Sequence, residues 1–274
     1  MSVYVVTGVS KGIGFEFLRQ LSEDKDNLVI GLVRNKTATE TKVAEELGGD
    51  RSNVHILHGD LTNYASLKEA AAETAKIVGD RGVDYLVANA GLVPEFDAFG
   101  PVSALSDNID QVDRLTAETF QTNVTGQLHL FNLFVPLIKK GKVKKVIAIS
   151  SGVGDVDFIN QTEMDVAPIY AASKAALNLI VAKFNAEYGK KEGILFLSIS
   201  PGLVDVGRYE NSTPEQVNVF GGLVGKLVAY APHFKGPITP EESVKAVRAV
   251  WEEASVEEGW GGAFVSHLGS KQWV

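Results

Sequence analysis

The feature that most constrains this fold is a series of short segments that are apolar along their whole length and alternate with helical patterns. A strand that is apolar on both faces must be covered on both sides, which is typical of a parallel sheet with helical crossovers. Because such crossovers are right-handed, the sequence predicts an α/β fold: a Rossmann-type, doubly wound parallel sheet of about seven strands with helices on both faces. The candidate strands are residues 3–7, 28–33, 54–58, 83–88, 143–149, 194–199 and 263–266.

Apolar residues at helical spacing lie between the candidate strands. The predicted helices are residues 13–21, 39–47, 64–78, 113–139 and 168–188. No linker rich in Pro, Gly or Ser divides the chain, so residues 1–274 are predicted to form a single domain. Residues 203–236 interrupt the alternation after the sixth strand, on the side where ligands of open α/β sheets bind. We expect this stretch to be a lid over a ligand site; the alternative is a surface excursion without a ligand role.

A glycine-rich turn joins the first strand to the first helix. Its residues are Thr7, Gly8, Val9, Ser10, Lys11, Gly12, Ile13 and Gly14. Glycines allow a tight turn and a close approach of the backbone to a pyrophosphate, and the helix N-terminus offers N–H groups and a positive dipole end to phosphate. The turn follows a strand directly and opens an amphipathic helix. This context predicts a dinucleotide site, with a purely structural turn as the alternative.

The end of the second strand indicates which dinucleotide the site binds. A carboxylate at this position would bind a ribose 2′-hydroxyl, but the chain has Arg34 followed by Asn35. A guanidinium suits a 2′-phosphate, and Lys11 adds a second cation and Ser10 a hydroxyl. We therefore predict NADP(H) as the cofactor; the alternative is two solvated surface cations.

Tyr170 and Lys174 are four positions apart in a predicted helix, so they share one helical face. A nearby ammonium favours the phenolate and lowers the pKa of a tyrosine from its ordinary value of about 10. Tyr170 can then donate a proton to a carbonyl oxygen as hydride arrives, or accept one in the reverse direction. Taken alone, this spacing usually reflects an exposed lysine beside a packed tyrosine.

The pair occurs among other motifs, each at the end of a strand or in a helix. They are the glycine-rich turn, Asn89-Ala90-Gly91, Asn123, Ser150-Ser151 and Pro201-Gly202. In this order they resemble the short-chain dehydrogenase/reductase family over nearly the whole chain. Within that family the chain is most similar to NADPH-dependent carbonyl reductases of the single-domain type, including fungal ketoreductase-like members.

The resemblance implies a role for each matching position. Tyr170 would be the general acid/base, and Lys174 would lower its pKa and bind the nicotinamide ribose. Ser151 would hydrogen-bond the substrate carbonyl and its developing oxyanion. Asn123 would hold a water in a proton relay from Lys174; without the motif order, a helix residue satisfying nearby backbone is the simpler interpretation. The other implied cofactor contacts are Asp60, Leu61, Asn89, Ala90, Gly91, Pro201, Gly202 and Val204.

Two positions depart from the family pattern. Ser151 and Tyr170 are 19 positions apart, which is longer than the family usually shows. We expect the extra segment at 156–166 to border the substrate pocket, the alternative being that it bulges outward. Val206 stands where the family often has a threonine that contacts the nicotinamide amide, so that contact is lost or replaced.

Composition excludes several other functions. The chain has no Cys, and its 5 His show no metal-binding spacing, so no metal is predicted. A net charge of −8 disfavours nucleic-acid binding. No apolar run approaches the roughly 20 residues that span a bilayer, and the N-terminus lacks a signal-peptide pattern. We therefore expect a cytoplasmic protein that does not bind membranes.

The expected activity is hydride transfer from NADPH to a ketone or aldehyde, with alcohol oxidation as the reverse. The alternatives are a non-redox enzyme on the same scaffold, such as a cyclase or epimerase, and a non-catalytic NADPH-sensing protein. Residues 92–106, the segment after Ser151 and residues 203–236 would form the substrate pocket. Their apolar side chains favour a largely uncharged, moderately bulky carbonyl compound. The family resemblance implies a homodimer or homotetramer formed through the helices at 113–139 and 168–188.

Overall fold

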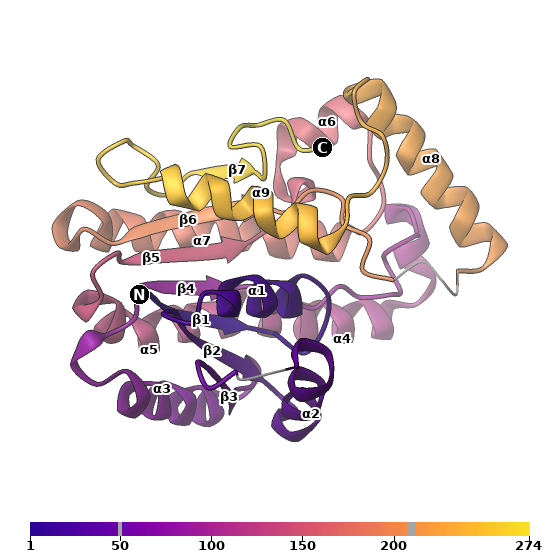
Figure 1. The fold of residues 1–274 in the computed structure, drawn as a ribbon. Coiled ribbons are helices and arrows are strands. Elements are labelled where there is room, and N and C mark those ends of the chain that lie inside the picture. The colour runs from indigo at the N-terminus through magenta and orange to yellow at the C-terminus, as the bar shows by residue number, and fades with distance from the viewer. Residues whose placement is uncertain (49–50, 208–211) are drawn as a thin grey trace.

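The computed structural model describes residues 1–48, 51–207 and 212–274. These residues contain one seven-stranded sheet with the order β3-β2-β1-β4-β5-β6-β7, in which every neighbouring pair is parallel (Figure 1). The strands are β1 (Val3–Thr7), β2 (Leu28–Val33), β3 (Val54–His58), β4 (Tyr85–Ala88), β5 (Lys145–Ile149), β6 (Leu195–Ser200) and β7 (Phe264–Ser266). The predicted single Rossmann-type sheet is therefore confirmed.

Helices cover both faces of the sheet and form a separate hydrophobic core with each (Figure 1). One face is covered by α1 (Gly12–Glu23), α2 (Lys36–Leu47) and α9 (Pro240–Glu253). The other is covered by α3 (Tyr64–Val78), α5 (Gly126–Lys140) and α7 (Pro168–Glu192). The central strands β1, β2, β4 and β6 are buried along their whole length. This explains why their sequences are apolar without alternation.

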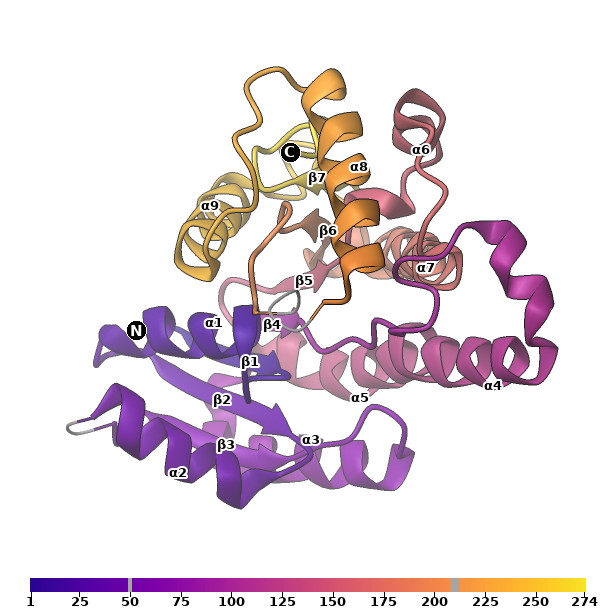
Figure 2. The same cartoon turned by 90° about the vertical axis from the view of Figure 1, so that its right-hand side faces the viewer.

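A third group of elements lies beyond the carboxyl ends of the strands. Figure 2 looks onto these ends and shows α8 (Pro214–Tyr230) over them, with α6 (Val156–Thr162) beside it. The two helices share a small apolar cluster whose buried members are Phe158, Met164, Leu227 and Trp273. The predicted lid at 203–236 therefore contains a helix, although its positions 208–211 lie outside the described residues.

The observed elements differ from the predicted ones in several places. The helix predicted at 113–139 is α4 (Ile109–Phe120), a π-helical turn (Gln121–Thr125) and α5 in succession. None of the helices α6, α8 and α9 was predicted. The strand predicted at 143–149 begins only at Lys145, because the preceding N–H groups donate to a side chain and not to a neighbouring strand.

That side chain is Asp84, which is 6% exposed and directly precedes β4. Its Oδ2 accepts from the N–H of Val3 at 2.8 Å, at the start of β1. Its Oδ1 accepts from the N–H groups of Lys142 at 2.8 Å and Val143 at 3.1 Å, just before β5. Hydrogen bonds to a charged acceptor are stronger than neutral ones. A single carboxylate therefore aligns the beginnings of three neighbouring strands.

We expect Asp84→Ala to lower the free energy of unfolding by about 2–4 kcal/mol, because it leaves one buried and two partly buried N–H groups without their acceptor. Asp80→Ala, a change at an exposed position of the preceding 3₁₀ turn, should stay within about 0.5 kcal/mol of the parent. Urea denaturation of the three proteins measures the difference. Equal stability of the two variants would contradict the role given to Asp84.

Candidate active site

The glycine-rich turn packs against the segment that follows β4. Gly8 has a φ of 76°, and a Cβ at this position would lie 2.9 Å from Cα of Ala90. A Cβ on Gly14 would lie 2.1 Å from the carbonyl oxygen of Gly8. Any side chain at either position would force the backbone apart, so glycine is required for this turn to close.

The first turn of α1 fits a bound phosphate. Lys11 is the N-cap residue, and in the described part of the chain no side chain caps this helix and no acidic residue lies in its first turn. The leading N–H groups therefore retain their hydrogen-bonding capacity, and the positive end of the helix dipole faces the turn. Glycines that keep the backbone open and a helix that lacks its own cap match the requirements of a dinucleotide pyrophosphate.

The two cations predicted to face a 2′-phosphate lie at the same edge of the sheet. Arg34 directly follows β2 and is exposed, as are Lys11 and Ser10 in the turn. Asn35 next to Arg34 caps α2 through the N–H of Ala38 at 3.1 Å. The carboxyl end of β2 thus presents positive charge and no carboxylate.

A third cation at this edge was not predicted. Nζ of Lys42, on α2, lies 3.4 Å from the carbonyl oxygen of Ser10 and 4.4 Å from the ring centroid of Phe15. Its ammonium therefore lies beside the glycine-rich turn. Its sequence signal is only its place on α2, which begins two residues after Arg34. Spacing alone does not show that α2 turns this lysine toward the glycine-rich turn.

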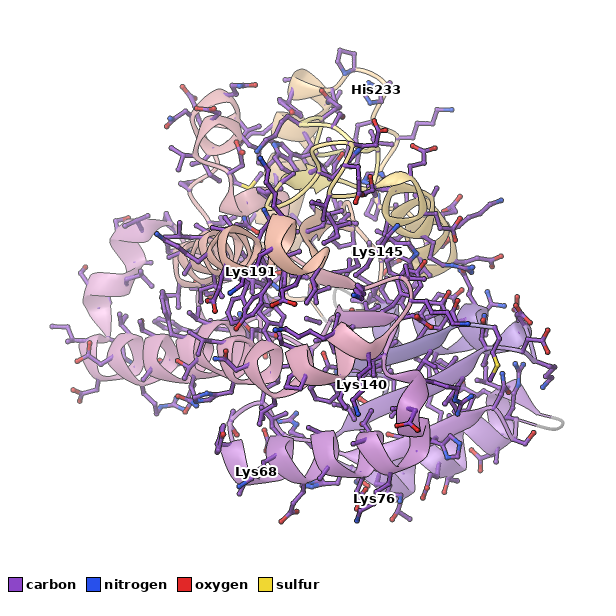
Figure 3. The ribbon with its side chains drawn as sticks, turned by 90° about the vertical axis from the view of Figure 1, so that its left-hand side faces the viewer. Lys68, Lys76, Lys140, Lys145, Lys191 and His233 are labelled. Carbon is purple, nitrogen blue, oxygen red and sulfur yellow. The ribbon has the colours of Figure 1, made fainter. Side chains whose placement is uncertain are left out.

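Other lysines lie at the opposite end of the molecule, where the strands begin and α5 and α7 end. Figure 3 looks onto that end and labels Lys140, Lys145 and Lys191. Lys145 donates to the carbonyl oxygens of Trp251 at 2.7 Å and Glu252 at 3.3 Å, at the C-terminus of α9. These cations stabilise helix ends and are far from the glycine-rich turn, because parallel strands place their starts and ends on opposite edges.

The residues after β4 are held by hydrogen bonds to β1 and α5. Nδ2 of Asn89 donates to the carbonyl oxygen of Thr7 at 3.0 Å, and the N–H of Ala90 donates to Oγ1 of Thr7 at 2.9 Å. Nε2 of Gln127 donates to the carbonyl oxygen of Ala90 at 2.7 Å. Asn89 and Ala90 are thereby fixed next to the glycine-rich turn. Thr7 and Gln127 are supporting residues that the motifs alone did not identify.

Asp60 and Leu61 lie just beyond the carboxyl end of β3. Oδ1 of Asp60 accepts from the N–H of Thr62 at 2.9 Å and from its hydroxyl at 2.8 Å. Leu61 is 7% exposed and packs against Gly126 at the start of α5. Both residues therefore have local structural roles at the edge where the glycine-rich turn lies.

Asn123 is 1% exposed and pairs with the backbone of the loop after β4. Its Oδ1 accepts from the N–H of Leu92 at 2.7 Å, and its Nδ2 donates to the carbonyl oxygen of Leu92 at 2.8 Å and to Oγ of Ser173 at 3.0 Å. It lies in the π-helical turn between α4 and α5, and such turns are frequent at functional sites. Asn123 thus satisfies nearby backbone and also connects the loop to α7. Its role in a proton relay stays a prediction.

Tyr170 and Lys174 lie on α7 as the spacing predicted. Lys174 is 4% exposed, its Nζ is 5.6 Å from the centroid of the Tyr170 ring, and it donates to the carbonyl oxygen of Ile149 at 2.8 Å. A Cβ on Gly91 would lie 3.5 Å from this Nζ, so the loop after β4 adjoins it. Burial lowers the pKa of Lys174 from its ordinary value of 10.5 to about 8, because the charged form is desolvated.

Ser151 follows β5 in an extended conformation, with φ −158° and ψ 142°. The next residue is fixed from two sides: the N–H of Gly152 donates to Oγ of Ser200 at 3.0 Å, and a Cβ on Gly152 would lie 3.0 Å from Cβ of Trp273. Trp273 also stacks on Phe264, with ring centroids 4.4 Å apart. The backbone that carries the Ser151 hydroxyl is therefore packed on rigid neighbours.

The segment after β6 lies across the site from the loop after β4. Gly202 has a φ of 84°, and a Cβ there would lie 2.9 Å from the ring of His267. Burial lowers the pKa of His267, which keeps its imidazole neutral at pH 7. Val204 forms an isolated bridge with Ile238. Val206 packs over the glycine-rich turn, its Cγ1 lying 3.3 Å from the place of a Cβ on Gly12.

A groove of about 230 Å³ lies where three chain segments meet under α8. The lining residues are Phe99, Pro101, Met164, Asp165, Val166, Val219, Gly222, Leu223 and Lys226. They come from the loop after β4, from the end of the extra segment between Ser151 and Tyr170, and from α8. Pro101 and Val166 also form an antiparallel bridge. The extra segment thus borders this groove at residues 164–166, while its α6 packs against α8.

Among the described residues, no group of three or more His, Cys, Asp or Glu is arranged to hold a metal ion. In the same part of the chain, no helix has both the length and the apolar character required to cross a membrane.

Comparisons with known proteins agree with this geometry. Residues 2–217 match the family model described as short chain dehydrogenase. A short-chain dehydrogenase/reductase of Pestalotiopsis fici is 61% identical over 274 residues and a short chain dehydrogenase of Hypocrea virens is 54% identical over 275, with 100% of each chain covered. The NADPH-bound carbonyl reductase from chicken fatty liver has the same fold, with a TM-score of 0.75 over 98% of both chains at 24% identity.

The match to the family model covers most of the chain, and both fungal relatives align over its full length. These matches, and the order of the site residues along the sheet, identify the protein as an oxidoreductase. The chain belongs to the short-chain dehydrogenase/reductase family.

Proposed function

We propose that this protein is an NADP(H)-dependent reductase of ketones or aldehydes that also oxidises the corresponding alcohols. The observation that carries the proposal is the buried Lys174 beneath Tyr170, at the edge of the sheet where the glycine-rich turn lies. Burying an ammonium costs stability, so a lysine kept buried at this place favours a functional role. The similarity in fold to an NADPH-bound carbonyl reductase supports the same assignment.

Residues after the ends of four strands, β1, β2, β4 and β6, would hold the cofactor. The turn from Gly8 to Gly14 and the N-terminus of α1 fit the pyrophosphate, while Arg34 and Lys11 fit the 2′-phosphate. Asn89, Ala90 and Gly91 line one side of the site, and Pro201, Gly202 and Val204 the other. Bound NADPH supplies the hydride for carbonyl reduction.

The side chains supply the proton and stabilise charge. With a pKa of about 8, Lys174 is mostly protonated at pH 7, and its ammonium favours the Tyr170 phenolate. This brings the acidity of Tyr170 closer to the working pH, which is what a general acid/base requires. The Ser151 hydroxyl donates a hydrogen bond to the carbonyl oxygen as negative charge develops on it. Asn123 holds a water that links Lys174 to solvent.

The groove under α8 would receive the rest of the substrate. Six of its lining residues are apolar or proline, and they favour a largely uncharged, moderately bulky carbonyl compound. We propose that the predicted lid acts through α8, because Leu223 and Lys226 line the groove. Leu227 anchors this helix in the small apolar cluster that α8 shares with α6.

The first prediction concerns the general acid. Tyr170→Phe removes the hydroxyl and keeps the ring, so kcat for carbonyl reduction should fall by about 10²–10⁴-fold while the Kd for NADPH is unchanged. Tyr188→Phe, on the same helix but at its far end, is the matched control and should behave as the parent. NADPH absorbance over a panel of carbonyl compounds gives the rates. Parental turnover by Tyr170→Phe would refute the mechanism, and tight NADPH binding without any turnover by the parent would indicate the sensing protein.

The second prediction concerns cofactor choice. Arg34→Ala should weaken NADPH binding by about 10–100-fold, since a charged hydrogen-bonding partner of the phosphate is lost, and leave NADH binding unchanged. Lys76→Ala on α3 provides a control for a loss of positive charge elsewhere. Fluorescence titration with both nucleotides measures the two affinities. Equal losses for NADPH and NADH would remove Arg34 from the 2′-phosphate site.

The third prediction follows from the burial of Lys174. The folded protein holds this ammonium with a pKa of about 8, against 10.5 for the exposed side chain. Between these pH values the unfolded chain binds more protons, so the stability of the parent rises with pH there. Lys174→Met removes the buried charge, and it should be at least as stable as the parent at pH 7 while losing activity.

The measurement is urea denaturation of the parent and Lys174→Met from pH 7 to pH 10. The stability deficit of the parent should be present in full below pH 8 and shrink as the pH rises above it. Lys190→Met, near the exposed end of α7, should show no such trend. A constant difference across the range would mean that Lys174 is not desolvated as described.

A further inference from the structure

The helix that carries Tyr170 and Lys174 begins without a cap of its own. Its N-cap residue is Ala167, whose side chain accepts no hydrogen bond. Pro168 comes next and has no N–H group, so the first backbone donors of α7 are those of Ile169 and Tyr170. These are the two positions that a capping side chain normally serves.

Asp97 supplies the missing acceptor from 72 positions away in the sequence. Its Oδ2 accepts from the N–H of Ile169 at 2.8 Å and from the N–H of Tyr170 at 3.3 Å. The residue is 0% exposed, so water does not replace these bonds in the folded protein. A carboxylate at this position also faces the positive end of the helix dipole. Asp97 therefore serves as the cap of α7 across the site.

The backbone of Asp97 holds the residue just before the helix. Its carbonyl oxygen accepts from the N–H of Ala167 at 2.8 Å. Ala167 has φ 56° and ψ 44°, a left-handed conformation that costs a non-glycine residue about 1–2 kcal/mol. A conformation of this cost persists only where its surroundings enforce it. Asp97 thus fixes the chain on both sides of Pro168, which lies two residues before Tyr170.

The loop that contains Asp97 contacts both halves of the proposed site. It follows Gly91, and its Leu92 is held by the side chain of Asn123. Further on, Phe99 and Pro101 line the groove under α8. Asp97 lies between these two regions, so a displacement of the loop would be transmitted directly to the backbone of Tyr170.

We propose that Asp97 is a positioning residue for Tyr170: it fixes the start of α7 and so sets where the phenol lies relative to the loop that borders cofactor and substrate. This proposal rests on the proposed function, in which Tyr170 transfers the proton. A displacement of about 1 Å in a reacting group can cost about 10²-fold in rate. The expected signature is a loss in kcat that cofactor binding does not share.

The test compares Asp97→Ala, which has no acceptor, with Asp97→Asn, whose amide oxygen can still accept both N–H groups. Asp97→Ala should lower kcat by about 10–100-fold, with the Kd for NADPH unchanged, and Asp97→Asn should recover most of the activity. Asn108→Ala is the matched control, because Asn108 caps α4 through the N–H of Gln111 and α4 carries none of the proposed catalytic residues. It should lose some stability and keep the parental kcat.

Amide hydrogen exchange reports on the two hydrogen bonds by which Asp97 caps α7. The amides of Ile169 and Tyr170 should exchange faster in Asp97→Ala than in the parent, and Asp97→Asn should lie between them. If Asp97→Ala does not fold, Asp97→Ser replaces it, since its shorter side chain also loses reach to the two amides. Faster exchange at Ile169 and Tyr170 with parental kcat would overturn the proposal, as would an equal loss of kcat and of NADPH affinity.

A double-mutant cycle separates this proposal from the proposed function. If Asp97 acts through the Tyr170 hydroxyl, Asp97→Ala should have little further effect on kcat in the Tyr170→Phe background. An undiminished effect in that background would overturn the positioning role. Failure of the proposed function is a different result: Tyr170→Phe alone would then turn over at the parental rate.

Discussion

The structure depends on the parallel pairing of its strands. Because every neighbouring pair is parallel, each strand must be followed by a crossover, and all strands end at one edge of the sheet. The sequence order reverses between β1 and β4, so the crossovers leave toward opposite faces on the two sides of this point. The glycine-rich turn, the loop after β4, Ser151 and the segment after β6 all meet at that edge. Short hydrogen bonds, such as those of Thr7 and Asn123, then fix their separations.

The positive charges at this edge of the sheet include one that lowers the stability of the fold. A chain with a net charge of −8 exposes Arg34 and Lys11 where β1 and β2 end. It also buries the ammonium of Lys174, which donates to the carbonyl oxygen of Ile149. Buried cations without a carboxylate partner are unfavourable for folding alone. The same desolvation is what makes the ammonium effective on a neighbouring phenol, since electrostatic interactions strengthen in a medium of low dielectric. Function and stability therefore make opposite demands on this residue.

Much of the fold and of the candidate site could be predicted from the sequence, and the elements and contacts that could not be predicted were hidden for physical reasons. The strands could be predicted because burial on both faces leaves a continuous apolar run. The helix at 64–78 could be predicted because burial of one stripe leaves apolar residues at helical spacing. The apolar stripe of α9, which includes Val244 and Val247, lies among acidic residues, and these weaken the periodic signal. Asp97 left no pattern, because a cap supplied from 72 positions away has no local signature. Asn123 could be matched to a motif. Its pairing with the backbone of Leu92, 31 positions away, has no sequence pattern and is visible only in the folded structure.

The carboxylate of Asp84 has a consequence for how the chain acquires this fold. Its three donors belong to Val3, Lys142 and Val143, so the bonds that align β1, β4 and β5 join Asp84 to residues 81, 58 and 59 positions away. Loops of that length close late, and folding slows as contacts become more distant in sequence. A growing chain that has made only its first half has the residues for β1, β2, β3 and β4 but lacks two of the donors to Asp84. The amino-terminal half is therefore expected to remain loosely ordered during synthesis until α5 and β5 emerge.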